Sequence, residues 1–362
     1  MELLYKPDWE TTKQNFRAWW NHEYFGRCAI SITAPKNGFR KYPPSLPAKL
    51  EDRWLDFDYL AAINEHRMQS TFYGGEAFPE WNPGSPGYSN QSVFLGCNIA
   101  LKEATAWVYP IIDKGELTSY NYNDFKIDKN NKWWKFCIDV RHFAVKETKG
   151  KSIPRHIGCG ACGDTLAGMR STEKLLMDLV ECPDYVRDFD LYLMKQAEQI
   201  YDEFYNIVHD GAEGSTCLFS LWSPGKSHAV QNDFAYMISS QMFNDIFLPV
   251  IEKQVNFLDH VVYHVDGIGN FKHVDALLEL ERIQALQILP GEGKPSPLHY
   301  MDILKKVQAA GRNLHIGIPA SEVEQALEQL SARGLFIVTR CETEQDARDL
   351  LKCVEKWSVD RG

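Results

Sequence analysis

The sequence predicts a closed barrel of eight parallel strands covered by helices, the (β/α)8 or TIM-barrel architecture, with an irregular N-terminal extension. The first observation is a tight alternation of short apolar strands and amphipathic helices over the last hundred residues. The second is that two apolar strands further upstream bring the count to six. Near-continuous apolar strands between helices are typical of a parallel sheet buried on both faces. The third is that no G-x-G-x-x-G motif follows a strand, which makes a doubly wound open sheet the less favoured alternative.

Four consecutive strand–helix units carry this prediction. Their strands are short and apolar, and each is followed within a few residues by an amphipathic segment. Such alternation favours parallel strands joined by helical crossovers. The expected strands are 260–267, 283–291, 313–319 and 335–341, and the expected helices are 270–280, 296–311, 320–334 and 343–357.

The middle of the chain adds two strands and longer helices. RHIGCG at 155–160 and TCLFSLWSPG at 216–225 have the apolar content of strands. Helices are expected at 132–150, at 171–208 with a break at Pro183, and at 237–258 with an interruption at Pro249.

The first part of the chain, about residues 1–125, is irregular. It is rich in tryptophan and tyrosine and contains the proline and glycine clusters KYPPSLP and EWNPGSPGY. CAISITA at 28–34 has the β-branched content of a buried strand, and 94–97 and 106–112 are further candidate strands. We expect residues 1–362 to form one barrel domain, with this part supplying the first strand and a cover.

Composition narrows the class of function. The formal net charge of −10 argues against nucleic acid or an anionic membrane as partner. No apolar run approaches the ~20 residues of a membrane helix, and the first residues lack the apolar core of a signal peptide. With nine scattered cysteines, we expect a cytoplasmic protein whose thiols are reduced.

In a barrel of this type, functional residues lie at the carboxyl ends of the strands. We predict substrate contacts from Trp222, Asp233, Tyr263 and His315, although Trp222 could instead cap the barrel and Asp233 a helix. The residues expected at strand ends are Cys159, Cys162, Trp222, Ser223, His264, Asp266, Pro290, Glu292, His315, Pro319, Arg340 and Cys341.

Three of these strand-end residues could bind one metal ion. His264 and Asp266 are two residues apart and share a face of their strand, and Cys341 ends the last strand. Imidazole, carboxylate and thiolate together suit zinc better than magnesium, and three protein ligands with one open position are typical of a catalytic site. On spacing alone, however, a hydrogen-bonded histidine and an aspartate in a turn before glycine are the more common explanation.

The CGAC segment at 159–162 has the spacing of half a zinc knuckle or of a redox pair. No second C-x-x-C completes a four-cysteine site, and the small residues around it favour close packing beside a strand end. The other cysteines, apart from Cys341, fall in apolar patterns and are expected in the core.

The segment LAGMRSTEKLLMDLVECPDYVRDF resembles the helix pattern L-x-G-x-R-x-x-E-x-L-L-x-D-L-x-x-x-P-x-x-V of the uroporphyrinogen decarboxylase superfamily, which includes cobalamin-linked methyltransferases such as methylcobamide:coenzyme M methyltransferases. The resemblance continues through MISSQMFNDIFLPVIEKQV and the last four strand–helix units. It is similar to an uncharacterised bacterial branch with the strand end Y-H-x-D-G, here Tyr263 to Gly267.

The resemblance to the methyltransferase branch implies a zinc site. In that branch zinc is held by a His-x-Cys pair and a later cysteine on the last strand. His264 falls on the histidine and Cys341 on the later cysteine, whereas Asp266 stands at the first cysteine. The resemblance therefore implies zinc at His264, Asp266 and Cys341, with cobalamin presented by a partner corrinoid protein to a small methyl acceptor. Carboxylate in place of thiolate makes the site harder and favours an oxygen substrate.

The decarboxylase branch matches less well. Its R-Q-A-G-R signature is absent, and only Arg27 lies near the corresponding place. Two alternatives to methyl transfer nevertheless remain open. One is a decarboxylase or other acid–base enzyme that acts on a small anion or tetrapyrrole through Asp233, His264 and His315. The other is a barrel that binds a corrinoid or tetrapyrrole without chemistry.

Overall fold

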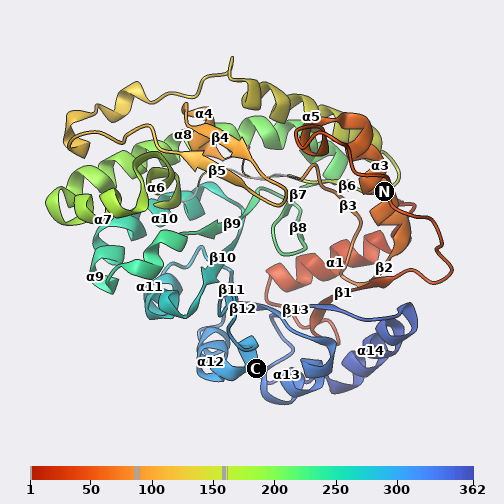
Figure 1. The fold of residues 1–362 in the computed structure, drawn as a ribbon. Helices are drawn as coiled ribbons and strands as arrows, with labels where there is room; N and C mark the ends of the chain where they lie inside the picture. The colour runs from red at the N-terminus through yellow and green to blue at the C-terminus, as the bar shows by residue number, and fades with distance from the viewer. Residues whose placement is uncertain (1, 85–86, 88–89, 157–159, 161) are drawn as a thin grey trace.

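The computed structural model describes residues 2–84, 87, 90–156, 160 and 162–362. Its main sheet contains six parallel strands, with β2 antiparallel to β1 at one edge. In Figure 1 these strands lie in the middle of the molecule, with α12–α14 along one side and α5 and α8 along the other. The strand order is β2 (Thr71–Gly75), β1 (Ala29–Pro35), β13 (Leu335–Arg340), β12 (Asn313–Gly317), β11 (Ala285–Leu289), β10 (His260–Asp266) and β9 (Ser227–Gln231).

Three small strand pairs accompany the main sheet. β3 (Glu80–Trp81) pairs parallel with β6 (Ile153–Pro154). β4 (Asn98–Leu101) and β5 (Ala106–Tyr109) form one antiparallel pair, and β7 (Ser215–Cys217) and β8 (Leu221–Ser223) form another. Within the described residues no ladder joins β9 back to β2, so the fold is mixed α/β with a parallel central sheet, and closure into eight strands stays a prediction.

The helices follow the chain in the order expected for strand–helix units. Short 3₁₀ turns precede α11, α12 and α13, and a π turn precedes α10, whose second residue is Pro249. The α-helices are α1 (Trp9–Trp20), α2 (Asp52–Leu55), α3 (Phe57–Ser70), α4 (Gln91–Phe94), α5 (Lys132–Thr148), α6 (Asp164–Arg170), α7 (Thr172–Glu181), α8 (Pro183–Ala212), α9 (Ser240–Met242), α10 (Leu248–Phe257), α11 (Val274–Leu278), α12 (Met301–Ala309), α13 (Val323–Gln329) and α14 (Glu344–Trp357).

The four strand–helix units predicted from the sequence are confirmed as β10 to α14, and the strand at 28–34 is confirmed as β1. Two strand predictions are wrong. Phe94 ends helix α4, and residues 95–97 follow it as a turn instead of forming a strand. Residues 216–225 fold back as the β7–β8 hairpin, because Phe219 and Ser220 both adopt positive φ (72° and 61°) and reverse the chain. Besides β11, the strand that pairs parallel with β10 is β9, which was not among the predicted strands.

The two faces of the main sheet carry different side chains. Ile30, Ile32, Val261 and Val265 face the helices and belong to the largest apolar cluster. Alternation in a strand sends their neighbours to the other face, which we call the inner face. One row of paired residues crosses the inner face near mid-strand and contains four polar side chains, Gln231, His264, Gln287 and His315, followed by Phe336.

The amino ends of the strands are closed by aromatic packing from α1. Phe16 stacks on Phe336 with ring centroids 5.8 Å apart, and Trp19 Nε1 donates to the Gly334 carbonyl at 3.0 Å. Trp20 Nε1 donates to the carbonyl of Trp222 at 2.9 Å. This aromatic base blocks the amino end and leaves the carboxyl ends as the open side of the inner face.

Two buried ion pairs explain the roles of two arginines that the sequence analysis pointed to, Arg170 and Arg27. Arg170, in the quoted helix pattern, binds Asp178 through Nε (2.7 Å) and Nη2 (3.0 Å) and also donates to the carbonyls of residues 112 and 115. Arg27 makes a two-pronged bond to the buried Glu76, at 2.7 and 2.8 Å. Arg27 is therefore committed to a structural pair inside the protein.

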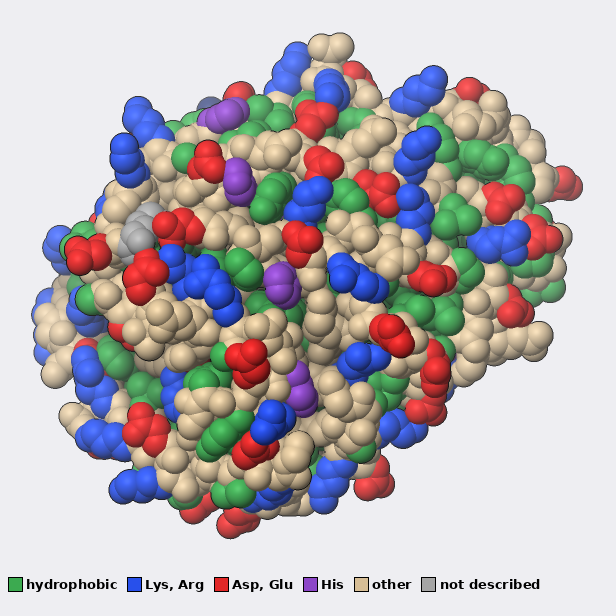
Figure 2. Space-filling view, turned by 180° about the vertical axis from the view of Figure 1, so that it is seen from behind, with side chains coloured by type: hydrophobic (Ala, Val, Ile, Leu, Met, Phe, Trp, Pro, Cys, Tyr) green, Lys and Arg blue, Asp and Glu red, His purple; other side chains and the backbone are tan. Residues whose placement is uncertain are grey.

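The surface seen in Figure 2 mixes basic and acidic side chains, with small apolar areas between them. Among the described residues, none of the helices combines the length and apolar content that crossing a membrane requires.

Candidate metal centre

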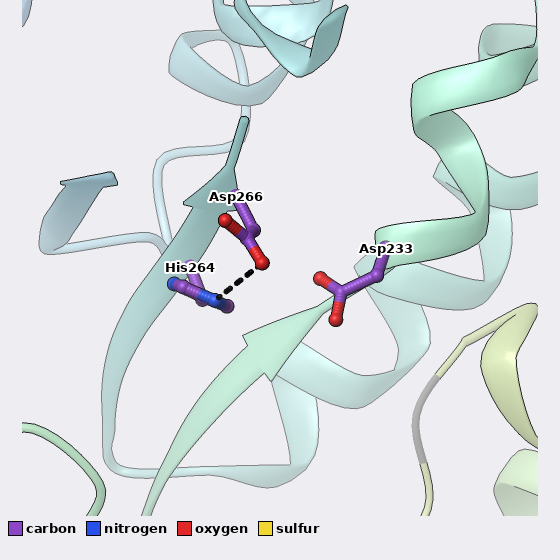
Figure 3. Close-up of side chains that lie close together, drawn as sticks. All are labelled: Asp233, His264 and Asp266. Atoms are coloured by element: carbon purple, nitrogen blue, oxygen red, sulfur yellow. Dashed lines mark ion pairs between the residues drawn. The ribbon is translucent and has the colours of Figure 1, made fainter. Parts of the chain in front are cut away.

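Asp233, His264 and Asp266 meet at the carboxyl ends of β9 and β10. One ligand atom of each lies within 4.8 Å of the ligand atoms of the other two. Figure 3 shows the three side chains pointing toward one another, two from the end of β10 and one from just beyond β9. This grouping of one imidazole and two carboxylates forms a candidate site for a divalent cation.

Strand register places these residues together. Gln231, the last residue of β9, pairs with His264 of β10. Asp233 follows Gln231 by two residues, and Asp266 follows His264 by two residues. Both aspartates therefore return to the inner face at the strand ends. Gly267 then turns the chain with φ of 81°, and a side chain there would meet the ring of Tyr236.

His264 is oriented by a hydrogen bond on the ring nitrogen that faces away from the cluster. Its Nδ1 contacts Oε1 of Gln287 on the neighbouring strand β11. An amide oxygen only accepts, so Nδ1–H is the donor in this contact, and in the neutral imidazole this tautomer leaves the lone pair on Nε2. Nε2 lies 3.8 Å from Oδ2 of Asp266. A histidine held in this way is prepared to be a metal ligand through Nε2.

Asp233 is positioned by its immediate neighbours. Gln231 Nε2 donates to Asp233 Oδ2 at 3.1 Å. The helical turn after β9 is capped by Asn232, whose side chain accepts from the backbone of residue 235, so Asp233 is not the cap. Desolvation and the carboxylates of Asp164 and Asp266 raise the pKa of Asp233 to about 7.

Asp164, the first residue of α6, organises the same turn. Its carboxylate accepts from the backbone N–H groups of Phe234 (2.8 Å) and Asp233 (3.1 Å), and from Gln231 Nε2 (3.3 Å). Burial raises the pKa of Asp164, and these three donors oppose that rise. A third carboxylate therefore lies behind the cluster, which adds to the negative charge that a cation would meet.

Cys341 is not a member of this cluster within the part of the chain that the structure describes. It follows β13, and its backbone N–H donates to the Thr33 carbonyl at 2.9 Å. Burial and the nearby acids Asp346 and Glu342 raise the pKa of its thiol. Asp233 takes the place in the cluster that the sequence predicted for Cys341, whose role as a ligand stays a prediction.

Within the described residues, the other predicted substrate-binding residues do not join this cluster. Trp222 is fully buried in the aromatic base, where Nε1 donates to the Ala212 carbonyl at 2.9 Å, because the β7–β8 hairpin carries it to the amino ends. Tyr263 is buried on the helix-facing side of β10, and burial raises its pKa well above the ordinary value. His315 lies on the inner face, with Nε2 bonded to the Phe219 carbonyl at 2.9 Å. Burial lowers the pKa of His315 to about 4, so this imidazole is neutral at pH 7.

Of the CGAC pair, Cys159 lies outside the described residues. Cys162 is buried, and its thiol contacts Oδ2 of Asp190 at 3.4 Å and Nδ2 of Asn232 at 3.8 Å. Burial and Asp190 raise the pKa of Cys162 well above its ordinary value, so it packs as a thiol behind the turn that carries Asp233. A redox role for the pair stays a prediction.

Sequence reasoning missed the residues that support the ligands. Asp164, Gln231 and Gln287 were not singled out, although Gln231 and Gln287 are polar residues inside apolar strand patterns. A polar side chain at an inward position of a strand was the available signal for both glutamines. Asp164 follows Gly163 and begins α6, a position that resembles ordinary helix capping.

No protein-family model matches the chain, and no curated protein matches it. Among solved structures, a methyltransferase from Methanosarcina mazei matches with a TM-score of 0.60 and 11% sequence identity, covering 95% of this chain and 98% of that one. The apo homocysteine methyltransferase MmuM from Escherichia coli matches with a TM-score of 0.29 and 13% identity, over 53% of this chain and 92% of that one. The first match shows that the fold extends over nearly the whole chain.

Proposed function

We propose that this chain is a zinc-dependent, methyltransferase-like enzyme on a (β/α)8 barrel, which moves a methyl group between a corrinoid protein and a small-molecule acceptor. The observation that carries the proposal is the Asp233–His264–Asp266 cluster, with His264 held by Gln287. The likeness of the fold to a protein described as a methyltransferase supports the choice of reaction class. The sequence resemblance supports zinc and cobalamin.

The residues present fit a divalent cation. Nε2 of His264 offers a lone pair, and Asp233 and Asp266 offer carboxylate oxygens from the same direction. Gln287 fixes the imidazole, and Gln231 fixes the carboxylate of Asp233. Zinc accepts this combination of nitrogen and oxygen ligands, and three protein ligands are typical of a catalytic site.

Each residue has a defined task in the proposed reaction. Asp233, His264 and Asp266 bind the ion and orient the acceptor at the open side of the inner face. The aromatic base keeps water from entering at the amino ends. Zinc supplies Lewis acidity, which favours the deprotonated form of an acceptor hydroxyl or thiol near neutral pH. Two carboxylates in the set make it harder than a thiolate site, which favours an acceptor that reacts through oxygen.

Metal binding tests the first part of the proposal. We expect protein purified without added metal to bind about one equivalent of zinc, and Asp233→Asn or His264→Ala to weaken binding by more than about tenfold. Asp275→Asn is the matched control, because this exposed carboxylate follows β10 but pairs with Lys306. Cys341→Ser separates the two ligand sets, since it weakens binding only if the thiolate also ligates. Binding of less than about a tenth of an equivalent of zinc by the wild-type protein would refute the zinc site.

Methyl transfer tests the second part. Zinc-loaded protein is mixed with methylcobalamin and small alcohols or thiols, and demethylation is followed by visible absorbance. We expect turnover that disappears in His264→Ala and persists in Asp275→Asn. Decarboxylation, or another acid–base reaction of a small anion, by metal-free protein would overturn the proposal in favour of acid–base chemistry. A cobalamin absorbance shift without turnover would overturn it in favour of a binding function.

A further inference from the structure

A second feature of the open side is a cavity of about 460 Å³ opposite the acidic cluster. It lies at the carboxyl ends of β1 and β13 and extends to α3, β2 and β3. Its size is within the range of small-molecule sites. The cavity contains two arginines, Arg67 and Arg340. Its lining is Thr33, Ala34, Pro35, Arg67, Ser70, Thr71, Tyr73, Phe78, Glu80, Asn82 and Arg340.

Arg340 projects from the inner face of the sheet. It is the last residue of β13 and alternates with Val338 and Phe336, both of which pack in or against the aromatic base. Arg340 is exposed, and among the residues that the structure describes it makes no ion pair or hydrogen bond through its side chain. An arginine directed into a cavity without a carboxylate partner is available to a ligand.

Arg67 reaches the same cavity from the last turn of α3. Its Nη2 donates to the Asn64 side chain and to the Glu80 carbonyl at 2.9 Å, which fixes the plane of the guanidinium. Nε and Nη1 make no hydrogen bond within the described part of the chain, and no carboxylate there pairs with Arg67. The fixed plane leaves these donors to an oxyanion, the group that a guanidinium binds through two parallel bonds.

The balance of charge in the cavity is positive. The one carboxylate in the lining, Glu80, has Oε2 3.6 Å from Nε of Arg155, so its charge is matched by an arginine outside the lining. Tyr73 keeps its hydroxyl proton, because burial raises its pKa to about 12. Two unpaired guanidiniums in a chain of net charge −10 form a local reversal of sign.

The arginines and the acidic cluster occupy opposite parts of one open side. Asp266 ends β10 and Arg340 ends β13, with β11 and β12 between them. Three strand spacings of about 4.8 Å give roughly 14 Å along the sheet. Side chains from both sides shorten the distance that a ligand has to span.

We propose that Arg67 and Arg340 bind the oxyanion head group, carboxylate or phosphate, of the small molecule on which this protein acts. The substrate is then a small organic anion whose other end lies toward Asp233, His264 and Asp266. This second statement rests on the proposed function, whereas binding of the anion by the two arginines does not.

Anion binding is measured on the full chain by isothermal titration calorimetry, with acetate, succinate and inorganic phosphate as probes. We expect one of these anions to bind, and Arg67→Gln and Arg340→Gln each to weaken it by about tenfold, the loss of one charged hydrogen-bonding pair. Arg40→Gln is the matched control, because this exposed arginine lies outside the cavity lining. Preference between acetate and phosphate identifies the head group. Equal affinity in the wild type and both cavity variants, or no binding of any probe, would overturn the inference.

The same titrations with chelator-treated protein and with His264→Ala separate the two proposals. Anion binding that survives removal of the metal supports the arginine site. If untreated wild-type protein also binds no zinc, the arginine site stands and the proposed function is refuted. Zinc binding with an unchanged anion affinity in Arg67→Gln and Arg340→Gln supports the metal site and refutes the arginine site. Because the arginine variants could perturb α3 or β13, zinc affinity of each variant serves as a check that the sheet is folded.

Discussion

Replacement of the buried Asp190 by asparagine tests how the segment behind the candidate metal centre is held. Asp190 lies on α8 and is 1% exposed. Its Oδ2 accepts from the backbone N–H of Gly163 at 2.9 Å and contacts the Cys162 thiol at 3.4 Å. No described cation pairs with this carboxylate. Burial raises its pKa from 3.8 to about 7, and the Gly163 N–H opposes the rise only in part.

The sign of the effect on stability follows from proton binding. Between the unfolded pKa near 3.8 and the folded pKa near 7, the folded state holds a proton at Asp190 that the unfolded state has lost. Stability from this group is therefore full below the unfolded pKa and falls as the pH rises toward 7. The slope is about 1.4 kcal/mol per pH unit, which amounts to about 2 kcal/mol between pH 5 and pH 7.

Urea unfolding of the wild type and of Asp190→Asn at pH 5, 6 and 7 measures this difference. We expect the asparagine variant to gain about 2 kcal/mol on the wild type over the interval, because it has no proton to lose. Asp188→Asn on the same helix is the control and should keep the wild-type slope, since that carboxylate is half exposed beside Arg187. Parallel stability curves for the wild type and Asp190→Asn would refute a raised pKa at Asp190.

Two further substitutions separate structural from functional residues. Asp178→Asn leaves Arg170 buried without its carboxylate, so we expect a loss of about 3–5 kcal/mol in urea unfolding, whereas Asp349→Asn at an exposed pair should leave the midpoint unchanged. Trp222→Phe removes the bond to Ala212 and part of the aromatic base, so we expect a lower unfolding midpoint and an unchanged zinc affinity; a weaker zinc site at wild-type stability would instead place Trp222 at the metal centre.

Local pattern was sufficient for most of the second half of the chain. The four units from β10 to α14 have short apolar strands and amphipathic helices, so hydrophobic periodicity identified each of them. The β7–β8 hairpin escaped because no glycine marks its turn. Phe219 and Ser220 adopt positive φ without one, a conformation that sequence gives no reason to expect and that the packing of Phe219 against His264 and His315 compensates.

The candidate metal centre could be predicted only where its residues share one strand. His264 and Asp266 are two positions apart, so strand alternation alone places them on the same face. Asp233 joins them through the register of β9 on β10, a strand that the polar sequence SHAVQ concealed. Pairing between strands is a tertiary property, and a single sequence therefore cannot state which strand end becomes the neighbour of another.

The charges around the open side favour a cation between Asp233, His264 and Asp266. The cluster brings two carboxylates together, and Asp164 lies directly behind Asp233, whose backbone N–H donates to it. Within the described residues, no lysine or arginine side chain pairs with any of these three acids. The two arginines of the cavity, Arg67 and Arg340, lie on the same open side but across the sheet. The raised pKa of Asp233 reflects burial and the repulsion among these acids, and the three donors to Asp164 oppose that repulsion. A divalent ion bound at the cluster would remove this repulsion, and an anion at the two arginines would then no longer be repelled by the acidic half of the open side.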